Sequence, residues 1–349
     1  MGKIKSTKIT PKSVGRFLLN NAIIELLIIM ALIVGFTTNN FFTMGNFNNL
    51  AMNTSIRFLI ALGVSGCLIT KGTDLSAGRA AGLAACVGGV LMQDIDYVGR
   101  MFPGMPQMNM FVAFLIVIAI TGVIGLINGL IISILKVPPF IATLGTQTAI
   151  YGTTLIFTNA TPIGGFQESY TKFTSGALFN INGEKVLPYL MIIAVIFGVV
   201  FWVLYNKTTY GKNMYAIGGN ENAAEVSGVN TVRSKILIYT VAGVMYGVAG
   251  FLLAGKSGGA ASSLGMGYEL EAIAGCTIGG VSTTGGIGRV GGVLVGVLVF
   301  EILKICLQFM NVNPYYNYIV QGLVIVLAVS LDIRKYLAKK QFLYKGKGD

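Results

Sequence analysis

Few side chains in this 349-residue sequence could do chemistry, because histidine is absent. Without histidine the chain cannot build a Ser-His-Asp triad, a His-ligated metal site or an imidazole proton relay. No GxxxxGK[ST] phosphate-binding loop occurs either. The four cysteines lie in apolar stretches without CxxC spacing and are interpreted as buried small hydrophobes: Cys67, Cys86, Cys276 and Cys306.

Charged side chains inside apolar stretches are the next candidates, because intramembrane charge is a functional hypothesis by default. There are four of them: Glu25, Arg57, Glu301 and Lys304. Glu301 and Lys304 are three residues apart, so they can neutralise each other on one helix face. A proton-coupled carrier needs a connected set, and these charges look isolated in the sequence. Glu269 and Glu271 open an apolar segment, where the helix dipole favours carboxylates.

Two glycine-rich stretches, 72–78 and 282–288, interrupt apolar segments in the two halves of the chain. Such interruptions point to a transporter pathway, because irregular backbone at membrane depth must line a cavity or lie buried in protein. The alternative interpretation is local. Asp74 and Ser76 would cap a helix, and 282–288 would form a tight cytoplasmic turn.

The polar stretch 206–234 contains the signals for a short helix. Asn220 suits an N-cap, Glu221 a first turn and Gly228 the position after the last turn, which predicts a helix of about two turns. Since an isolated helix this short is marginal in water, it must dock. It would dock either on its own membrane domain or on a cytoplasmic subunit, with Ala223, Val226 and Ser227 as its small contact face.

The elements that position these residues are membrane helices. The sequence is 54% hydrophobic and 11% charged, which makes a soluble globular fold very unlikely. A crossing needs roughly 20 apolar residues. Ten apolar segments predict an all-α polytopic fold of about ten transmembrane helices: 17–36, 47–70, 77–93, 109–135, 139–158, 187–205, 235–255, 269–284, 290–309 and 315–331.

The charges give the orientation. Basic residues, Lys71, Arg79, Lys136 and Arg289 among them, concentrate in the segments predicted to be cytoplasmic, so the positive-inside rule places both termini in the cytoplasm. The net charge of +12 then needs no nucleic acid. The predicted domains are a basic N-terminus (1–16), one transmembrane domain (17–331) with an outer loop (159–186) and an inner loop (206–234), and a basic tail (332–349). Glycines four apart, such as Gly125 and Gly129, predict close helix packing or a dimer seam.

Five strings in series resemble the signature stretches of monosaccharide ABC importer permeases, over nearly the whole chain. They are GTDLSAG at 72–78, GLING at 125–129, PPFIATLGT at 138–146, AIGGN at 216–220, and IGGVS with GGIG at 278–288. Within that family the stretch Lys71–Arg79 is most similar to the galactose/methyl-galactoside subgroup.

The resemblance implies a bacterial inner-membrane homodimer that works by alternating access. Its partners would be a cytoplasmic ATPase with two fused nucleotide domains, which holds the ATP and Mg²⁺, and an extracytoplasmic sugar-binding protein. The permease itself would bind no cofactor or metal and would not be an enzyme. The implied ATPase-coupling residues are Gly218, Gly219, Asn220, Glu221, Ala223, Ala224, Ser227 and Gly228.

A neutral sugar needs a path walled by hydroxyl, amide and small groups. The residues predicted to line this path or gate it are Asp74, Ser76, Thr143, Thr146, Gln147, Ser282, Thr283, Thr284, Gly285 and Gly286. The alternatives are an ion-gradient-driven secondary carrier, a ribose-type permease, and an intramembrane enzyme, which the lack of histidine disfavours.

Overall fold

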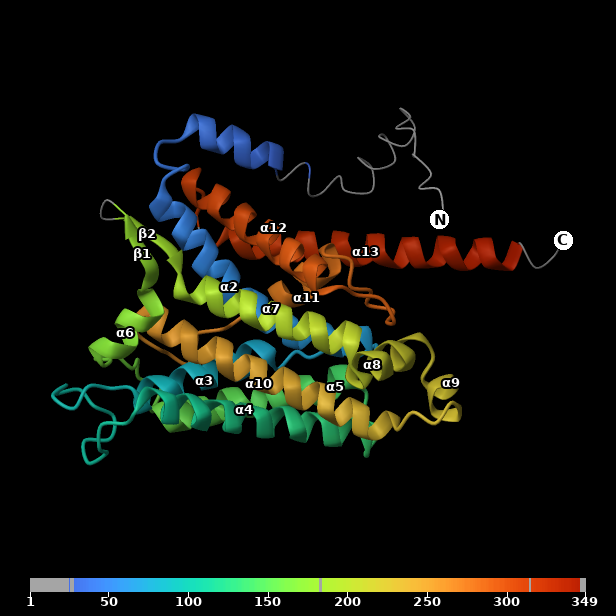
Figure 1. The fold of residues 1–349 in the computed structure, drawn as a ribbon, viewed down its shortest axis with the longest axis horizontal. Coiled ribbons are helices and arrows are strands. Elements are labelled where there is room, and N and C mark those ends of the chain that lie inside the picture. Colours follow the sequence, from blue (N-terminus) through green and yellow to red (C-terminus); the bar gives the residue numbers. More distant parts are fainter. Residues whose placement is uncertain (1–24, 26–27, 182–183, 314, 346–349) are drawn as a thin grey trace, which may run out of the picture.

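A computed structural model describes residue 25 and residues 28–181, 184–313 and 315–345, and a helix over Ile28–Thr37 precedes the labelled elements (Figure 1). In chain order these elements are α2 (Met44–Ile69), α3 (Ala77–Leu91), α4 (Met110–Ser133), α5 (Pro139–Thr158), α6 (Glu168–Ser175), β1 (Ala177–Ile181), β2 (Glu184–Pro188), α7 (Tyr189–Lys207), α8 (Thr209–Gly219), α9 (Glu221–Val226), α10 (Thr231–Ser257), α11 (Tyr268–Ile278), α12 (Val290–Phe309) and α13 (Tyr316–Lys345).

The described chain is mostly helical, as predicted, and each predicted apolar segment includes a helix in its described part. Five described helices are long and apolar enough to cross a membrane: α2, α4, α7, α10 and α12. Two predicted boundaries differ most from the structure: α11 already ends at Ile278 within the predicted 269–284, and α13 continues from the predicted end at 331 to Lys345. The all-α prediction also missed the antiparallel hairpin β1–β2, which forms at the end of the predicted outer loop.

Local signals in the sequence explain where several helices begin. The side chains of Asn109 and Asn230 accept hydrogen bonds from the backbone N–H groups of Phe111 and Arg233, at 2.8 and 2.9 Å, and so cap α4 and α10. Pro139 opens α5, where its fixed φ is already helical and its missing N–H costs nothing. These signals define the starts of helices, which the hydrophobic pattern alone does not locate.

The buried helices α2 and α10 run through the middle of the bundle, and glycines let α4 approach α10 closely. A Cβ on Gly125 would lie 2.2 Å from the carbonyl oxygen of Tyr239, and one on Gly243 would lie 2.3 Å from that of Thr121. These glycines therefore pack helices within one chain, which is the first of the two roles predicted for such spacing.

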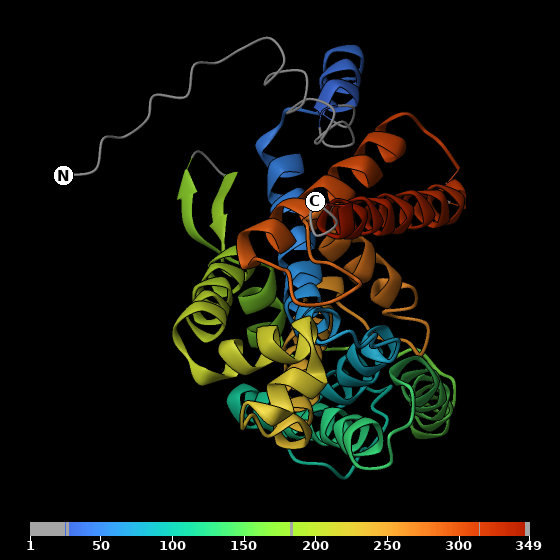
Figure 2. The ribbon, with the colours of Figure 1, turned by 90° about the vertical axis from the view of Figure 1, so that its right-hand side faces the viewer.

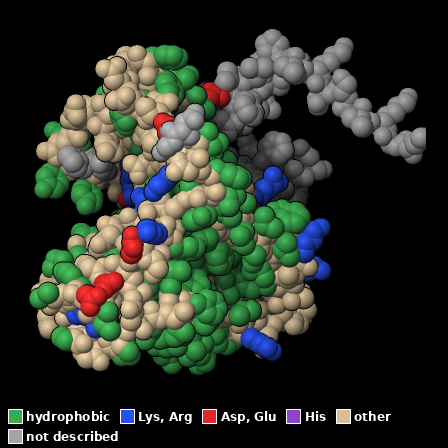
Figure 3. Space-filling model, turned by 60° about the vertical axis from the view of Figure 1, so that its left-hand side comes forward, with side chains coloured by type: hydrophobic (Ala, Val, Ile, Leu, Met, Phe, Trp, Pro, Cys, Tyr) green, Lys and Arg blue, Asp and Glu red, His purple; other side chains and the backbone are tan. Residues whose placement is uncertain are grey.

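The two ends of the bundle differ. One end, here called the α9 end, carries α8 and α9, and the opposite hairpin end carries α6, β1 and β2 (Figure 1). Figure 2 is turned so that the α9 end faces the viewer. Hydrophobic side chains cover much of the body between the ends, as Figure 3 shows from the hairpin side. This distribution matches a body surrounded by lipid and two ends in water.

Two helices in the bundle are half-length. The 11 residues of α11 span about 16 Å, and the 15 residues of α3 are also fewer than the roughly 20 needed to cross a bilayer core. A non-helical segment precedes each one, 70–76 before α3 and 258–267 before α11. The segment 70–76 is largely buried, whereas 258–267 is partly buried, with Ala260 and Gly265 inside the protein and Met266 exposed. The segment 258–267 contacts the start of α3, where a Cβ on Gly78 would lie 2.4 Å from the Gly265 carbonyl oxygen. Interrupted helices with irregular backbone packed against protein are typical of transporter cores.

The sequence suggests that the interruptions at 72–78 and 282–288 correspond to each other in the two halves of the chain, but the structure does not pair them. The stretch 258–267, which lies between two of the predicted apolar segments, packs against the start of α3, whereas 282–288 forms a turn at the α9 end. Gly285 and Gly286 adopt positive φ angles there, which suits glycine. The local-turn alternative for 282–288 was correct, because the chain must reverse between α11 and α12.

Candidate functional site

The stretch 72–78 is tied into the bundle by a buried polar network. One carboxylate oxygen of Asp74 accepts hydrogen bonds from the backbone N–H and hydroxyl of Ser76, at 3.0 and 2.6 Å, and the other accepts from the Tyr246 hydroxyl at 3.0 Å. The amide of Asn128 donates to the Ser76 hydroxyl at 2.9 Å, and the backbone N–H of Leu75 donates to the Thr143 hydroxyl at 3.1 Å. The network joins the segment before α3 to α4, α5 and α10.

Asp74, Ser76 and Thr143 are fully or almost fully buried in this network. Asp74 closes a local turn just before α3 and also holds α10, whereas Ser76 occupies the N-cap position of α3 without making the predicted side-chain cap, because its hydroxyl donates to Asp74. Both carboxylate oxygens of Asp74 are hydrogen-bonded in this network, whereas Oδ1 of Asn128 has no partner among the described residues. In this conformation these three side chains fix the backbone of the interruption and offer no surface to a solute.

The glycine-rich turn 282–288 meets the end of α8. The backbone N–H of Gly286 donates to the Ile69 carbonyl oxygen at 2.8 Å, and the Tyr215 hydroxyl donates to that of Gly288 at 2.9 Å. Gly218 lies at the centre of this junction: a Cβ there would lie 1.8 Å from the Ile69 oxygen. Lys71 donates to the Gly219 carbonyl oxygen at 3.3 Å. The structure thus brings together the predicted gate glycines and the predicted coupling glycines.

Helix α9 forms where the sequence predicts it. The side chain of Asn220 accepts a hydrogen bond from the backbone N–H of Ala223 at 3.1 Å, and Gly228 takes a positive φ of 87° after the last turn. Ala224 is buried against the permease body, and both carboxylate oxygens of Glu221 accept from Lys235, at 2.6 and 2.7 Å. One side of α9 is therefore anchored on its own chain.

The other side of α9 is exposed at the α9 end. Ala223, Val226 and Ser227, which the sequence predicts as the contact face, are all exposed, and Val226 is 91% exposed. An aliphatic side chain this exposed on a short helix suits a docking surface. The helix thus docks on its own domain and leaves this face free.

Three of the four charged residues within the apolar segments, Arg57, Glu301 and Lys304, are connected, contrary to the prediction that they are isolated. Arg57 on α2 lies 2.7 Å from Glu271 on α11 and 2.7 Å from Glu301 on α12. Lys304 lies 2.5 Å from Glu271 and 3.7 Å from Glu301, as its spacing predicted. Arg57 also lies over the ring of Tyr268. Two cations and two anions therefore hold the half-helix α11 between α2 and α12.

A polar cavity of about 350 Å³ lies between α3, α5, α11 and α13, a volume typical of small-molecule pockets. Its polar lining residues are Arg79, Gln147, Glu269, Tyr318 and Gln321. The guanidinium of Arg79 donates to the Ser262 carbonyl oxygen at 3.1 Å and lies 4.0 Å from the ring centre of Tyr151. Arg79 was counted above among the cytoplasmic charges, and that assignment is wrong because the residue lies inside the bundle.

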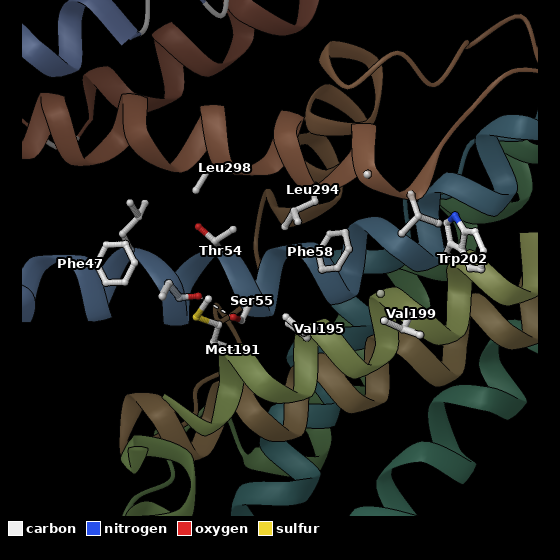
Figure 4. Close-up of a pocket in the computed structure, with 16 residues that line it drawn as sticks. Phe47, Thr54, Ser55, Phe58, Met191, Val195, Val199, Trp202, Leu294 and Leu298 are labelled. Atoms are coloured by element: carbon white, nitrogen blue, oxygen red, sulfur yellow. Dashed lines mark hydrogen bonds between the residues drawn. The ribbon is translucent and has the colours of Figure 1, made fainter. Parts of the chain in front are cut away.

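A second pocket, of about 500 Å³, has an almost entirely apolar lining. Figure 4 shows Phe58 of α2 between Leu294 of α12 and Val195 and Val199 of α7. Because this lining offers a sugar almost no hydrogen-bonding groups, the groove suits lipid chains better than a sugar.

The predicted path residues therefore separate into four places. Asp74, Ser76 and Thr143 belong to the buried network, while Ser282, Thr283, Thr284, Gly285 and Gly286 form the turn at the α9 end. Thr146 lines an apolar groove between α4 and α5. Only Gln147 reaches the polar cavity. Sequence reasoning missed Arg79, Tyr318 and Gln321 there, because no motif marks them, and interpreted Glu269 only as a carboxylate at a helix start.

Comparison with known proteins assigns the family. The model of the family described as branched-chain amino acid transport system / permease component matches residues 46–329. The chain belongs to this permease family. The match begins at the start of α2 and ends within α13, so it includes the cavity, the ion network and α9.

The curated relatives of this permease are sugar importers. The galactose/methyl galactoside import permease protein MglC of Haemophilus influenzae is 46% identical over 323 residues, covering 92% of this chain and 96% of the relative. The protein of the same name from Escherichia coli K12 is 45% identical, covering 94% and 98%. The ribose import permease protein RbsC of Bacillus subtilis is 38% identical, covering 88% and 91%. No solved structure gives a significant match.

The family and the structure together give the general role. The chain is a multi-pass membrane permease of the importer type, in agreement with the expectation from its glycine-rich strings. Its relatives are transport subunits and not enzymes. The described residues contain no cluster of three or more potential metal-ligating side chains, so nothing in that part of the chain indicates metal chemistry.

Proposed function

We propose that this permease is the membrane subunit of an ATP-binding cassette importer for galactose or methyl galactoside. The observation that carries the proposal is 45–46% identity to permeases of that name over more than nine-tenths of the chain. The ribose import permease of Bacillus subtilis is less similar, at 38%. The polar cavity supports the same conclusion, because a neutral polyol needs amide and carboxylate partners inside a membrane.

The proposed topology has ten crossings, with both termini in the cytoplasm of a bacterial inner membrane. The α9 end is then cytoplasmic and the hairpin end faces outward. Lys71, Lys207, Lys235 and Arg289 support this orientation, because they lie at or beside the ends of elements that meet the α9 end. The segments 1–16 and 346–349 lie outside the described residues. Residues 17–331 would form one permease domain, with 332–345 continuing α13 into the tail.

The proposed energy source is a separate cytoplasmic ATPase, with two fused nucleotide domains that bind ATP and Mg²⁺. Support comes from α9, whose exposed face could dock in a groove of that subunit while Glu221 and Ala224 anchor it to the permease. Gly218, near the end of the preceding helix α8, contacts the turn 282–288. A movement imposed on α9 would therefore reach the ends of α2 and α12 through the end of α8.

The proposed assembly contains two copies of the permease and an extracytoplasmic sugar-binding protein at the hairpin end. Helices α5 and α13 flank the polar cavity and carry exposed apolar side chains, including Leu144 and Leu323. A cavity containing charged side chains would be costly to leave open to lipid. A second copy covering this face would enclose a path between the two subunits.

The test is uptake of labelled galactose by cells that carry this permease with its candidate ATPase and binding protein. We expect uptake to need all three components and to stop when the ATPase phosphate-binding loop is inactivated. Labelled ribose in the same cells distinguishes the ribose-type alternative. Uptake that persists with the inactive ATPase and collapses with the ion gradient would identify a secondary carrier and refute the proposal.

A further inference from the structure

The polar cavity contains a carboxylate with unused hydrogen-bonding capacity. Glu269 is only 6% exposed, lines the cavity, and its Oε2 atom accepts no hydrogen bond from the described residues. Buried polar groups in folded proteins are almost always partnered, and leaving one without a partner is costly. The Glu269 side chain therefore lines the cavity, while one of its oxygens, Oε2, is enclosed against Gly78 of α3 and has no hydrogen-bond partner in the described part of the chain.

The surrounding charges do not supply the missing partner. Arg79, the cation in the same cavity, is directed to the Ser262 carbonyl oxygen and the ring of Tyr151, and no ion pair joins it to Glu269 among the described residues. The neighbouring Glu271 is the acid that pairs with Arg57. The start of α11 stabilises negative charge near Glu269 through its dipole, yet this leaves Oε2 unpaired.

The space around this carboxylate is kept by glycine. A Cβ on Gly78 would lie 2.0 Å from Oε2 of Glu269, so only glycine leaves room for the side chain at this point. Gln147 lies on the α5 wall of the same cavity, and its side-chain amide has no hydrogen-bond partner among the described residues. On the α13 wall, the Gln321 amide donates to the Gly267 carbonyl oxygen at 3.3 Å and so holds the loop before Glu269.

We propose that this cavity is a sugar subsite within the permease, in which Glu269 accepts hydrogen bonds from hydroxyl groups of the transported sugar and Gln147 supplies an amide partner. The inference rests on the proposed function and deepens it. Each sugar hydroxyl is both donor and acceptor, so a carboxylate on α11 and an amide on α5 that line the same cavity complement it. Hydrogen bonds to a charged acceptor are about twice as strong as neutral ones. The permease would then recognise the sugar after the binding protein releases it.

The test uses a cysteine reporter in the cavity. Gly322 lines the cavity on α13 and a Cβ there meets nothing within 4 Å, so Gly322→Cys fits without disturbing the wall. The four native cysteines are buried, which keeps background labelling low. The purified permease and ATPase complex carrying Gly322→Cys is treated with a maleimide in the presence of methyl galactoside, with sucrose at the same concentration as the control.

We expect methyl galactoside to slow the labelling. Glu269→Gln should raise the methyl galactoside concentration that gives half-maximal protection about tenfold or more, because a charge-assisted hydrogen bond is lost. The matched control is Glu168→Gln, an exposed carboxylate at the hairpin end, which should leave protection unchanged. If the Glu269→Gln permease does not assemble with the ATPase, Gln147→Leu tests the same site from α5 and should also weaken protection.

Several outcomes would overturn the subsite. Equal protection in Glu269→Gln, no protection by the sugar, or a Gly322→Cys thiol that does not label at all would each contradict it. If sodium chloride slows the labelling more than potassium chloride does, and the sugar has no effect, Glu269 holds a cation instead. Uptake of labelled galactose by the Gly322→Cys importer is measured in parallel. Uptake without protection refutes the subsite alone, whereas absence of uptake in the unmodified importer refutes the proposed function.

Discussion

At the scale of single residues, the ion network is the feature that depends most on partners distant in sequence. Arg57 and Glu271 are 214 positions apart, yet the Nε atom of Arg57 donates to Glu271 at 2.7 Å. With two positive and two negative charges, the network of Arg57, Glu271, Glu301 and Lys304 is neutral as a set. Removal of one member leaves an unpaired charge inside the bundle, which costs more than the intact pair contributes.

We therefore predict that Arg57→Gln destabilises the permease by about 3–5 kcal/mol, and that adding Glu301→Gln recovers part of this loss by restoring neutrality. Thermal unfolding of the purified permease in detergent would measure both. The control is Lys172→Gln, because the pair of Lys172 with Glu168 is exposed and should contribute less than about 1 kcal/mol. Equal stability of the single and double variants would show that charge balance is not what the network provides.

A second prediction at this scale concerns two adjacent glycines. Gly218→Ala would place its Cβ 1.8 Å from the Ile69 carbonyl oxygen, whereas a Cβ on Gly219 meets nothing within 4 Å. We expect Gly218→Ala to separate α8 from the turn 282–288 and to abolish uptake, while Gly219→Ala keeps most of it. The measurement is uptake of labelled galactose by cells with each variant, with the amount of permease in the membrane checked by immunoblot. Similar uptake by both variants would contradict the tight junction.

At the scale of elements, α9 is a short helix with one anchored and one free side. Because Val226 is 91% exposed, a change there should not affect folding, and it should affect docking if this face meets the ATPase. We predict that Val226→Asp strongly reduces co-purification of the ATPase while the permease stays in the membrane. Val98→Asp is the matched control, since Val98 is fully exposed in the loop between α3 and α4. Normal co-purification of Val226→Asp would exclude this face.

The half-helices α3 and α11 show why a hydropathy pattern is insufficient at this scale. The pattern marks 77–93 and 269–284 as apolar, but it does not reveal that each crossing is completed by irregular backbone. The structure completes them with 70–76, which is largely buried, and with 258–267, which is partly buried and contacts α3. The carboxylate of Glu269 therefore sits at the start of a half-helix, inside the bundle and beside a cavity.

At the scale of the whole molecule, the orientation in the membrane can be tested with the same low cysteine background. We predict that Val98→Cys reacts with a membrane-impermeant maleimide in intact cells, and that Asn222→Cys on α9 reacts only after the membrane is opened. Both positions are exposed, so access should depend on the side of the membrane and not on burial. The reverse pattern would invert the proposed topology.

The sequence by itself determined the helical membrane class, the positions of the apolar segments and helix α9. These features depend on local properties: apolar run length, the cap at Asn220, the positive φ available to Gly228, and glycine spacing. The family resemblance rested equally on strings of adjacent residues and agrees with the relatives found by comparison. Local signals of this kind need no knowledge of which helices meet.

Tertiary structure alone decided which side chains share a site. It joined Arg57 to Glu271 and Glu301, and it placed Arg79 and Glu269 with Gln147 around one cavity. It also assigned the pairing of the two interruptions, 70–76 and 258–267. The physical reason is that these contacts join segments far apart in the chain, and their partners follow from helix packing and backbone approach, which the hydrophobic pattern of a membrane protein does not encode.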